Sequence, residues 1–504
     1  MKKRLLLLCS LLLISCGENV NTSINGSTSS SNSSSTSQVE NITISKSSII
    51  GLPLTSYDID VNNNTSEQLQ VVYGNDDFSY VNASIVGKNK VNVKLLAEGK
   101  GYIIVKTNST VGQRIDIESI DLKIINQDNH LALNTPTKIN LSKNVEASFS
   151  VEGEGASITS DGVLTVSAKS TFLVKVIYGD IVLSKEFDSY DRFDQLTILN
   201  RNNEFIKYHG RNVHKDNKVI MNNIGSGFEV KFYGTKLYAT FDAWYGAWYG
   251  KTKVSVLVDD EIDTNKRVVT LNTATTESEY LLVDNLPQGV HTVKVLKRTE
   301  ALSTSMTLHN IRTDGYFKIV DKTKKLTIEA YGDSITAGYG NLRGDISDTT
   351  NSDYQDGLQT YATYAATSLN ADINVQARSG IGMYTSNGID DTNQVNSFYN
   401  RVNYDGEYYW NFDNYTPDLV FINLGTNDFW NPSVFNLEKF KEEYSKFIVT
   451  LANIYGSNTS FILMSGLMEN NVNSVLPSII EDAKQKIDNE IHYLKFDQCR
   501  EGHP

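Results

Sequence analysis

Strand-like runs alternate with amphipathic segments over the last third of the chain. The runs at 325–334, 371–380 and 417–428 (KLTIEAYGDS, ADINVQARSG and PDLVFINLGTND) each lead into a polar loop that contains glycine. The segments at 354–370 and 436–456 have helical spacing, and the second gathers apolar side chains on one face, namely Phe440, Tyr444, Phe447, Ile448 and Leu451. This alternation predicts an α/β domain with a parallel sheet over 319–504, whose ligand site lies at the carboxyl ends of the strands.

The region before this domain has the period of β-strands. Residues 41–125 and 126–190 hold short β-branched runs between turns, which predict two small antiparallel modules that resemble bacterial immunoglobulin-like domains. We interpret them as spacers, with carbohydrate binding as the alternative. Residues 191–318 alternate more regularly and predict a jelly-roll-like β-sandwich. The predicted fold class is therefore multidomain, with all-β modules followed by an α/β domain.

The first forty residues predict export and anchoring. Residues 1–15 have a basic start and an apolar run too short to span a membrane, as in a signal peptide. The Leu-Ile-Ser-Cys sequence that ends at Cys16 resembles a bacterial lipobox, which implies lipidation of Cys16. An ordinary signal with an incidental cysteine is the alternative. Residues 16–40, rich in Ser and Asn, predict a disordered tether, so we expect a lipoprotein on the extracellular face of the cell membrane.

The net charge and the cysteine content limit which partners the chain can bind and which disulfides it can form. The 504 residues carry a formal net charge of −13, which disfavours nucleic acid as a partner. The three cysteines are Cys9, Cys16 and Cys499. With Cys9 in the signal and Cys16 acylated, the mature chain has no intramolecular disulfide.

The candidate catalytic residues lie in four polar loops. Ser334, Gly380 and Asn427 follow predicted strands, and His503 lies in a loop after the last one. A serine hydroxyl needs a neighbouring base to become a nucleophile. Only His492 and His503 follow Ser334 in the sequence, and His492 falls within a strand pattern, so His503 is the expected base.

The motifs around these residues resemble the SGNH (GDSL-type) esterase superfamily. GDSITAGYG, RSG, GTND and GHP occur in the order of its four blocks and cover the last third of the chain. The resemblance implies that Ser334 is the nucleophile and His503 the base. It also implies an oxyanion hole made by the backbone N–H groups of Ser334 and Gly380 and the side-chain amide of Asn427, with Gly382 as a substitute for Gly380.

A sandwich placed directly before such a domain, with GDSITAGYGN and an aromatic after GTND, resembles carbohydrate esterase family 2. This resemblance implies removal of acetyl groups from acetylated xylan- or mannan-like polysaccharides. Trp430 occupies the place of a sugar-binding aromatic, with sugar stacking and plain packing both open. We expect neither metal nor cofactor. The alternatives are a generic short-chain or lipid esterase, and a non-catalytic glycan-binding surface protein, against which the intact blocks argue.

The end of the chain departs from the superfamily pattern. Arg500 stands three residues before His503, where the superfamily commonly has an aspartate. Glu501, Asp497 or a backbone carbonyl could orient the histidine instead, and we favour the carbonyl. Because such domains usually continue into a closing helix after the His-Pro pair, we expect the full form to have a further helix beyond Pro504.

Overall fold

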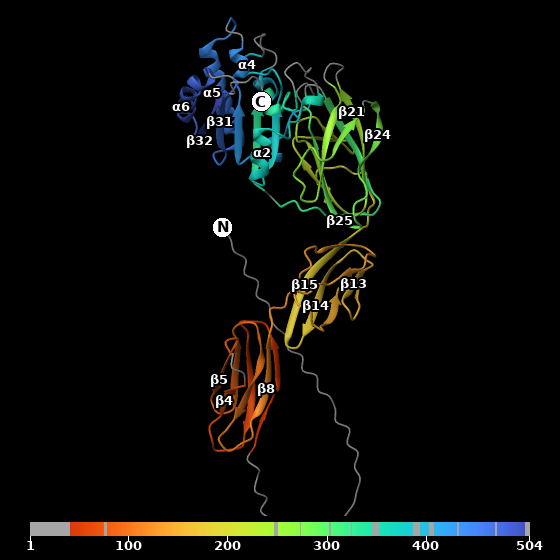
Figure 1. The fold of residues 1–504 in the computed structure, drawn as a ribbon, viewed down its shortest axis with the longest axis vertical. Helices are drawn as coiled ribbons and strands as arrows, with labels where there is room; N and C mark the ends of the chain where they lie inside the picture. The colour runs from red at the N-terminus through yellow and green to blue at the C-terminus, as the bar shows by residue number, and fades with distance from the viewer. Residues whose placement is uncertain are drawn as a thin grey trace, which may run out of the picture. The chain divides into compact units, whose positions relative to one another are not determined.

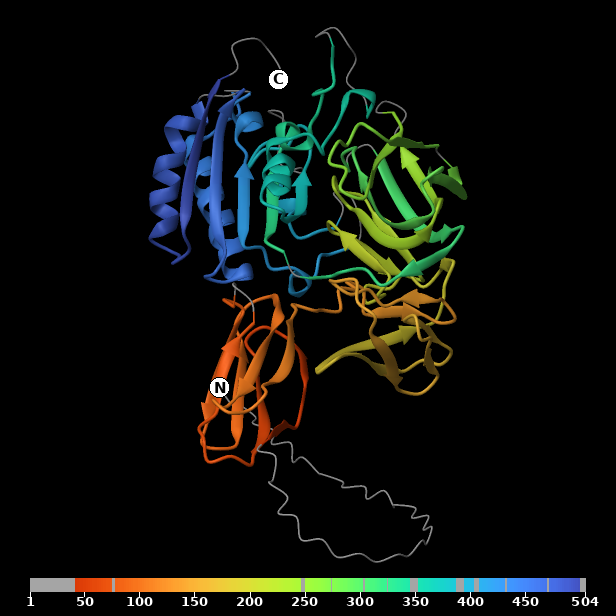
Figure 2. The ribbon, with the colours of Figure 1, turned by 60° about the horizontal axis from the view of Figure 1, so that its bottom comes forward.

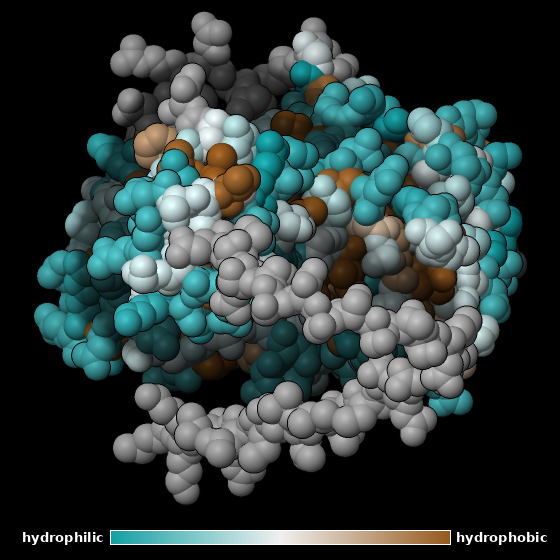
Figure 3. All heavy atoms as spheres, turned by 90° about the horizontal axis from the view of Figure 1, so that it is seen from below, coloured by the Kyte–Doolittle hydropathy of each residue, from teal (hydrophilic) through white to brown (hydrophobic). Residues whose placement is uncertain are grey.

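The computed structural model describes residues 41–498 except 75–77, 246–249, 273, 302–303, 324, 345–351, 387–393, 403–407, 431–432 and 469–470. The chain forms two compact units. The first extends to Asp121 and includes residues 179–181, and the second contains the remainder. Hydrophilic side chains dominate the face of the molecule drawn in Figure 3, where apolar residues appear as scattered spots.

The first unit is a β-sandwich of two four-stranded sheets (Figure 1), with strand orders β1-β3-β6-β5 and β2-β8-β7-β4. Alternate residues point into its core, so that Val91, Val93 and Leu95 of β6 are all buried. The antiparallel expectation fails for one pair in this unit, because β2 runs parallel to β8, and for one pair in the next module as well. The strands are β1 (Ile42–Ile44), β2 (Ser48–Gly51), β3 (Ser56–Asn63), β4 (Gln70–Tyr73), β5 (Val81–Val86), β6 (Lys90–Leu95), β7 (Gly99–Lys106) and β8 (Gln113–Ser119).

The second module packs a three-stranded sheet, β10-β13-β12, against a four-stranded sheet, β11-β14-β15-β9. Its core includes the stacked rings of Phe172 and Phe187, whose centroids are 5.9 Å apart. Ile124 packs against this core. The strands are β9 (His130–Ala132), β10 (Thr137–Lys138), β11 (Ser148–Glu152), β12 (Ala156–Ile158), β13 (Val163–Val166), β14 (Thr171–Tyr178) and β15 (Ile181–Tyr190).

A larger sandwich of two six-stranded sheets follows. The alternation seen in the sequence places Phe228, Val230 and Phe232 of β20 in its core, where the ring of Phe228 lies 6.4 Å from that of Phe241 of β21. The strands are β16 (Gln195–Leu196), β17 (Ile206–His209), β18 (Val213–Lys215), β19 (Lys218–Met221), β20 (Gly227–Gly234), β21 (Leu237–Tyr245), β22 (Thr252–Val258), β23 (Val268–Leu271), β24 (Ala274–Val283), β25 (Gly289–Lys297), β26 (Thr304–Thr313) and β27 (Tyr316–Lys318).

The last domain is an α/β layer structure whose five strands are all parallel, in the order β29-β28-β30-β31-β32 (Figure 2). Every residue of β28 is buried, as expected for a strand covered on both faces. The elements are β28 (Thr327–Gly332), α1 (Ser334–Ala337), η1 (Ser352–Tyr354), α2 (Tyr361–Ser368), β29 (Asp372–Ala377), α3 (Val395–Phe398), η2 (Phe412–Asn414), β30 (Leu419–Asn423), α4 (Thr426–Phe429), α5 (Leu437–Tyr455), β31 (Ser460–Leu467), α6 (Asn471–Lys484) and β32 (Ile491–Gln498). The predicted fold class is confirmed.

Helices cover both faces of this sheet. The apolar stripe of α5 predicted from the sequence is buried, and Phe440, Tyr444 and Phe447 pack with residues of the sheet and of α6. The opposite face receives α2 through Ala362 and Ala366. No helix among the described residues is both long enough and apolar enough to cross a membrane.

Helix α2 is shorter than its spacing predicts. It begins at Tyr361, after Thr360 forms a capping box with Thr363. The preceding residues are held by the sandwich instead. The Gly357 N–H donates to the Arg298 carbonyl at 3.0 Å, and the buried Asp356 carboxylate pairs with the Arg298 guanidinium at 2.6 Å. These tertiary contacts override the helical periodicity of residues 354–360.

A buried arginine joins the sandwich to the α/β domain. The Arg211 guanidinium pairs with the Glu329 carboxylate of β28 at 2.7 Å, and both side chains are fully buried. It also donates to the Tyr331 hydroxyl at 2.9 Å and to the carbonyls of Tyr399 and Arg401 at 2.6 and 2.9 Å. Because one arginine satisfies groups on β28 and on the 399–401 segment, it fixes the α/β domain against the sandwich.

Replacing Arg211 by alanine should destabilise this pair of domains by about 3–5 kcal/mol, because it leaves the Glu329 carboxylate buried without its partner. The measurement is the midpoint of urea or thermal unfolding. The double variant R211M/E329Q removes both charges at similar volume and should recover most of the loss. Equal instability of the single and double variants would contradict this account.

Candidate active site

Three of the residues chosen from the sequence lie together at one edge of the parallel sheet. Ser334 follows β28, Gly380 follows β29, and Asn427 follows β30. β28 is the middle strand of these three, and its last residue, Gly332, is in register with Ala377 of β29 and Asn423 of β30. The three loops therefore leave neighbouring strands at the carboxyl edge, where α/β sheets bind ligands.

The turn around Ser334 is built by local geometry. Asp333 caps helix α1, and its carboxylate accepts the Ile335 N–H at 3.0 Å. A Cβ on Gly332 would come within 1.9 Å of the Thr336 hydroxyl, so only glycine fits there. Ser334 is half-buried as the first residue of α1. The Gly-Asp-Ser order thus holds the serine at the end of a strand and at the start of a helix.

The loop after β29 is held by hydrogen bonds to the side chain of Asp428. Its buried carboxylate accepts the N–H groups of Met383, Tyr384 and Thr385 at 2.8, 2.8 and 3.0 Å. Burial raises the pKa of Asp428 to about 6, although these three bonds favour the charged form. Asp428 therefore orders the loop that contains Gly380.

Asp333 is buried as well, and burial raises its pKa to about 7. Its bond to Ile335 commits it to the helix cap. Both aspartates thus act as acceptors for backbone N–H groups of the loops around Ser334.

Asn427 has a fixed orientation. Its side chain is 8% exposed, and its amide donates one N–H to the Ile381 carbonyl at 2.7 Å. A side-chain amide has a second N–H, so this bond orients the amide and leaves one donor for a ligand.

The backbone of the two neighbouring loops supplies further donors. Gly380 has a φ of 82°, which glycine adopts readily. Within the described part of the chain, no hydrogen bond uses the backbone N–H of Ser334 or of Gly380. Gly382, the predicted substitute, is in a crowded position, since a Cβ there would meet the Thr385 carbonyl at 1.8 Å. Packing accounts for this second glycine.

The described histidines do not include a base at this edge. His492 is the second residue of β32, at the amino end of its strand, and pairs in register with Ile462. The carboxyl edge, where Ser334 lies, is at the other end of that strand. The predicted base His503 lies outside the described residues, as do Cys16, Arg500, Glu501 and the side chain of Asp497.

The two aromatics after the GTND motif have different environments. Phe429 packs against Phe435, with ring centroids 4.1 Å apart, and against Phe440. Trp430, at the C-cap of α4, is 71% exposed. Packing against neighbouring rings therefore accounts for an aromatic side chain at position 429, but it does not account for the exposed ring at position 430.

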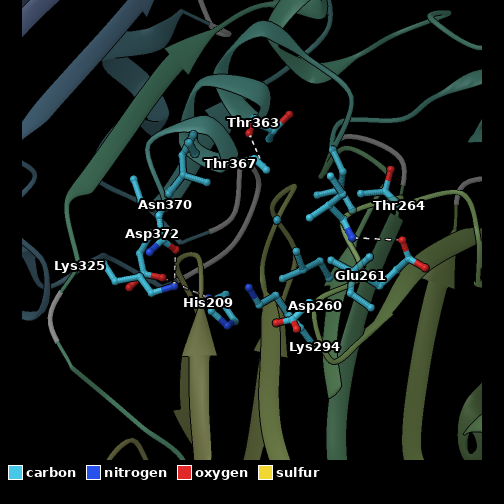
Figure 4. A pocket seen from close by; sticks show the side chains of 18 of the residues that line it. His209, Asp260, Glu261, Thr264, Lys294, Lys325, Thr363, Thr367, Asn370 and Asp372 are labelled. Atoms are coloured by element: carbon cyan, nitrogen blue, oxygen red, sulfur yellow. Dashed lines mark hydrogen bonds and ion pairs between the residues drawn. The ribbon is translucent and has the colours of Figure 1, made fainter. Parts of the chain in front are cut away.

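A separate cavity of about 320 Å³ lies between the sandwich and the α/β domain (Figure 4). Asn370 and Asp372 line it, and Asp372 is the first residue of β29. The cavity is therefore at the amino edge of the sheet, away from Ser334. The described residues contain no group of three or more His, Cys, Asp or Glu side chains that could hold a metal ion.

Comparison with known families decides the assignment of the two domains. Residues 208–322 match the family Carbohydrate esterase 2 N-terminal, and residues 328–496 match GDSL-like Lipase/Acylhydrolase. The chain therefore matches both family models one after the other, first the esterase 2 N-terminal model and then the GDSL-like model. The GDSL domain is the predicted α/β domain, and the esterase 2 N-terminal domain is the predicted sandwich.

Individual relatives agree with this assignment. The chain is 28% identical over 285 residues to cellulase/esterase CelE of Acetivibrio thermocellus, covering 54% of this chain and 33% of the relative. It is 29% identical over 206 residues to an acetylxylan esterase / glucomannan deacetylase of Cellvibrio japonicus, covering 37% of this chain and 56% of the relative. It thus spans a third to just over half of the length of these curated relatives.

One solved structure is similar to this chain over more than half of its length. It is the family two carbohydrate esterase from Clostridium thermocellum in complex with cellohexaose, which is 27% identical, with a TM-score of 0.54. The match covers 59% of this chain and 90% of that chain.

One contact at the site escaped the sequence analysis. Glu300 belongs to the esterase 2 N-terminal domain, yet its carboxylate contacts Ser379 in the loop of the GDSL domain that contains Gly380. The two residues are 79 positions apart, and the only sequence signal was an acidic residue between two strand patterns. No periodicity or motif connects such positions.

Proposed function

We propose that the chain is a serine esterase that removes O-acetyl groups from polysaccharide, with Ser334 as nucleophile and His503 as base. One observation carries the proposal. The half-buried Ser334 lies at the carboxyl edge between a loop with a backbone N–H at Gly380 and a loop with an oriented amide at Asn427. This is the donor set that acyl transfer requires around a tetrahedral intermediate.

The reaction proceeds in two steps. The Ser334 oxygen attacks the acetyl carbonyl while His503 accepts the hydroxyl proton, and the negative oxygen of the intermediate is bound by the N–H groups of Ser334, Gly380 and Asn427. Collapse of the intermediate expels the sugar oxygen, which takes the proton from His503. Water, deprotonated by His503, then attacks the acetyl-serine and releases acetate and free Ser334.

The name of one relative and the ligand in a similar solved structure support acetylated polysaccharide as the substrate class. One relative is named an acetylxylan esterase / glucomannan deacetylase, and the similar solved structure holds cellohexaose. The test is acetate release from acetylated xylan, mannan and glucomannan, with p-nitrophenyl acetate as a substrate that lacks the glycan. Hydrolysis of the small ester alone would indicate a generic esterase. Binding of the glycans without acetate release would indicate a glycan-binding protein.

Trp430 is proposed to bind the sugar, because a large exposed ring beside the Asn427 loop offers a flat apolar surface. Trp430→Ala should raise KM for acetylated glycans roughly tenfold, equivalent to about 1.4 kcal/mol. Its rate on p-nitrophenyl acetate should stay near that of the wild type. Tyr364→Ala is the matched control, since Tyr364 is 57% exposed on α2. Equal effects of Trp430→Ala on both substrates would exclude sugar stacking.

We also propose that Cys16 carries the lipid that anchors the protein to the extracellular face of the membrane. The basic start, the short apolar run and the Leu13-to-Cys16 sequence support it. Cys16→Ser should move the protein from the membrane fraction to the soluble fraction of the producing bacterium. Unchanged sedimentation with membranes would require another anchor.

A further inference from the structure

The linker between β25 and β26 of the esterase 2 N-terminal domain reaches into the active site of the GDSL domain. Glu300, in this linker, is fully buried. Its Oε2 accepts the backbone N–H of Ser379 at 2.8 Å, and its Oε1 accepts the Ser379 hydroxyl at 2.9 Å. Oε1 also accepts the Gln355 amide at 3.1 Å. The carboxylate therefore holds one residue of the Gly380 loop through two bonds.

A buried lysine lies next to this contact. Lys297 is fully buried, and its ammonium donates to the Thr304 hydroxyl at 2.8 Å and to the carbonyls of Thr299 and Glu300. Burial raises the pKa of Glu300 and lowers that of Lys297 to about 7, so desolvation opposes the charged form of each group. Two buried ionisable side chains stabilise a domain junction less well than apolar side chains of similar volume would. The geometry of the contact suggests a role beyond joining the domains.

The position of Ser379 explains that role. Because the N–H of Ser379 is bonded to Glu300, the backbone that enters Gly380 has a fixed orientation. Gly380 then turns the chain at a φ of 82°. Its own N–H has no hydrogen bond to another described residue, as expected for a donor kept for the substrate. Loss of the Glu300 contact would free Ser379 and let this donor move.

We propose that Glu300 is a positioning residue for ester hydrolysis, through which the esterase 2 N-terminal domain holds the Gly380 N–H in the oxyanion hole of the GDSL domain. The inference rests on the proposed function, because it assigns a role in the same reaction. It makes the sandwich a structural part of the catalytic site, in addition to any part it has in binding glycan.

The full chain with p-nitrophenyl acetate tests the inference without involving the glycan. Glu300→Ala should lower kcat on the order of 10²-fold, as loss of an oxyanion donor does, with KM within about threefold of the wild type. Glu300→Gln keeps a carbonyl oxygen for the Ser379 N–H and should remain within about tenfold of the wild-type rate. The affinity for methylboronic acid, which forms a tetrahedral adduct with a nucleophilic serine, should fall in parallel with kcat.

Lys207→Met is the matched control for a merely structural role. Lys207 pairs with Asp372 at 2.9 Å between the same two domains, at the amino edge of the sheet. This variant should keep kcat within about twofold. If Glu300→Ala keeps a near-wild-type kcat, or if Lys207→Met loses as much kcat as Glu300→Ala, the inference is wrong.

Should Glu300→Ala not fold, the variants Ser379→Ala and Glu300→Gln test the inference in its place. Ser379→Ala should lose about tenfold in kcat, and a wild-type rate would overturn the proposal. An inactive wild-type enzyme would instead refute the proposed function.

Discussion

Replacing Ser334 by alanine should abolish ester hydrolysis and leave the fold intact. The loss follows from removal of the only oxygen that forms the acyl-enzyme, and it should reach on the order of 10⁵–10⁶ in kcat. The fold should persist, because the turn is made by Gly332, by the Asp333 cap and by the backbone of α1 rather than by the serine hydroxyl.

The measurement is turnover of p-nitrophenyl acetate together with circular dichroism and a thermal midpoint. Ser368→Ala is a suitable control, since Ser368 is an exposed serine at the end of α2 in the same domain. Turnover above a trace in a clean preparation of the Ser334 variant would remove Ser334 from the mechanism.

Replacing His503 by alanine should lower the rate by several orders of magnitude, because the serine loses the group that accepts its proton. The described residues place His492 away from the carboxyl edge of the sheet. His492 is the second residue of β32, at the amino edge, with an exposed side chain beside Glu490. The carboxyl end of the same strand leads toward His503 in the sequence.

His492→Ala is the matched control and should keep the wild-type rate. In the wild type, kcat/KM should rise with pH as the histidine base loses its proton, and this rise should be absent in the His503 variant. Glu501→Gln and Asp497→Asn should each lower the rate by less than about tenfold, as expected if a backbone carbonyl orients the ring. A fall as deep as that of His503→Ala in either variant would identify that carboxylate as the missing third member.

The sequence by itself determined the elements whose formation is local. The buried run of β28 and the apolar stripe of α5 were readable because a strand covered on both faces and an amphipathic helix have distinct periods. The edge of the sheet that holds Ser334, Gly380 and Asn427 followed from the same pattern, since parallel strands bring their carboxyl ends together.

The tertiary structure alone decided the features that depend on distant contacts. Arg298 shortens α2 by holding Asp356. Phe429 packs against Phe435, whereas the neighbouring Trp430 is exposed, and this difference between two adjacent aromatics comes from tertiary packing. Glu300 reaches Ser379 across 79 residues of sequence. A side chain's partner across a domain junction is set by how two folded surfaces meet, and no local period or turn preference along the chain records that meeting.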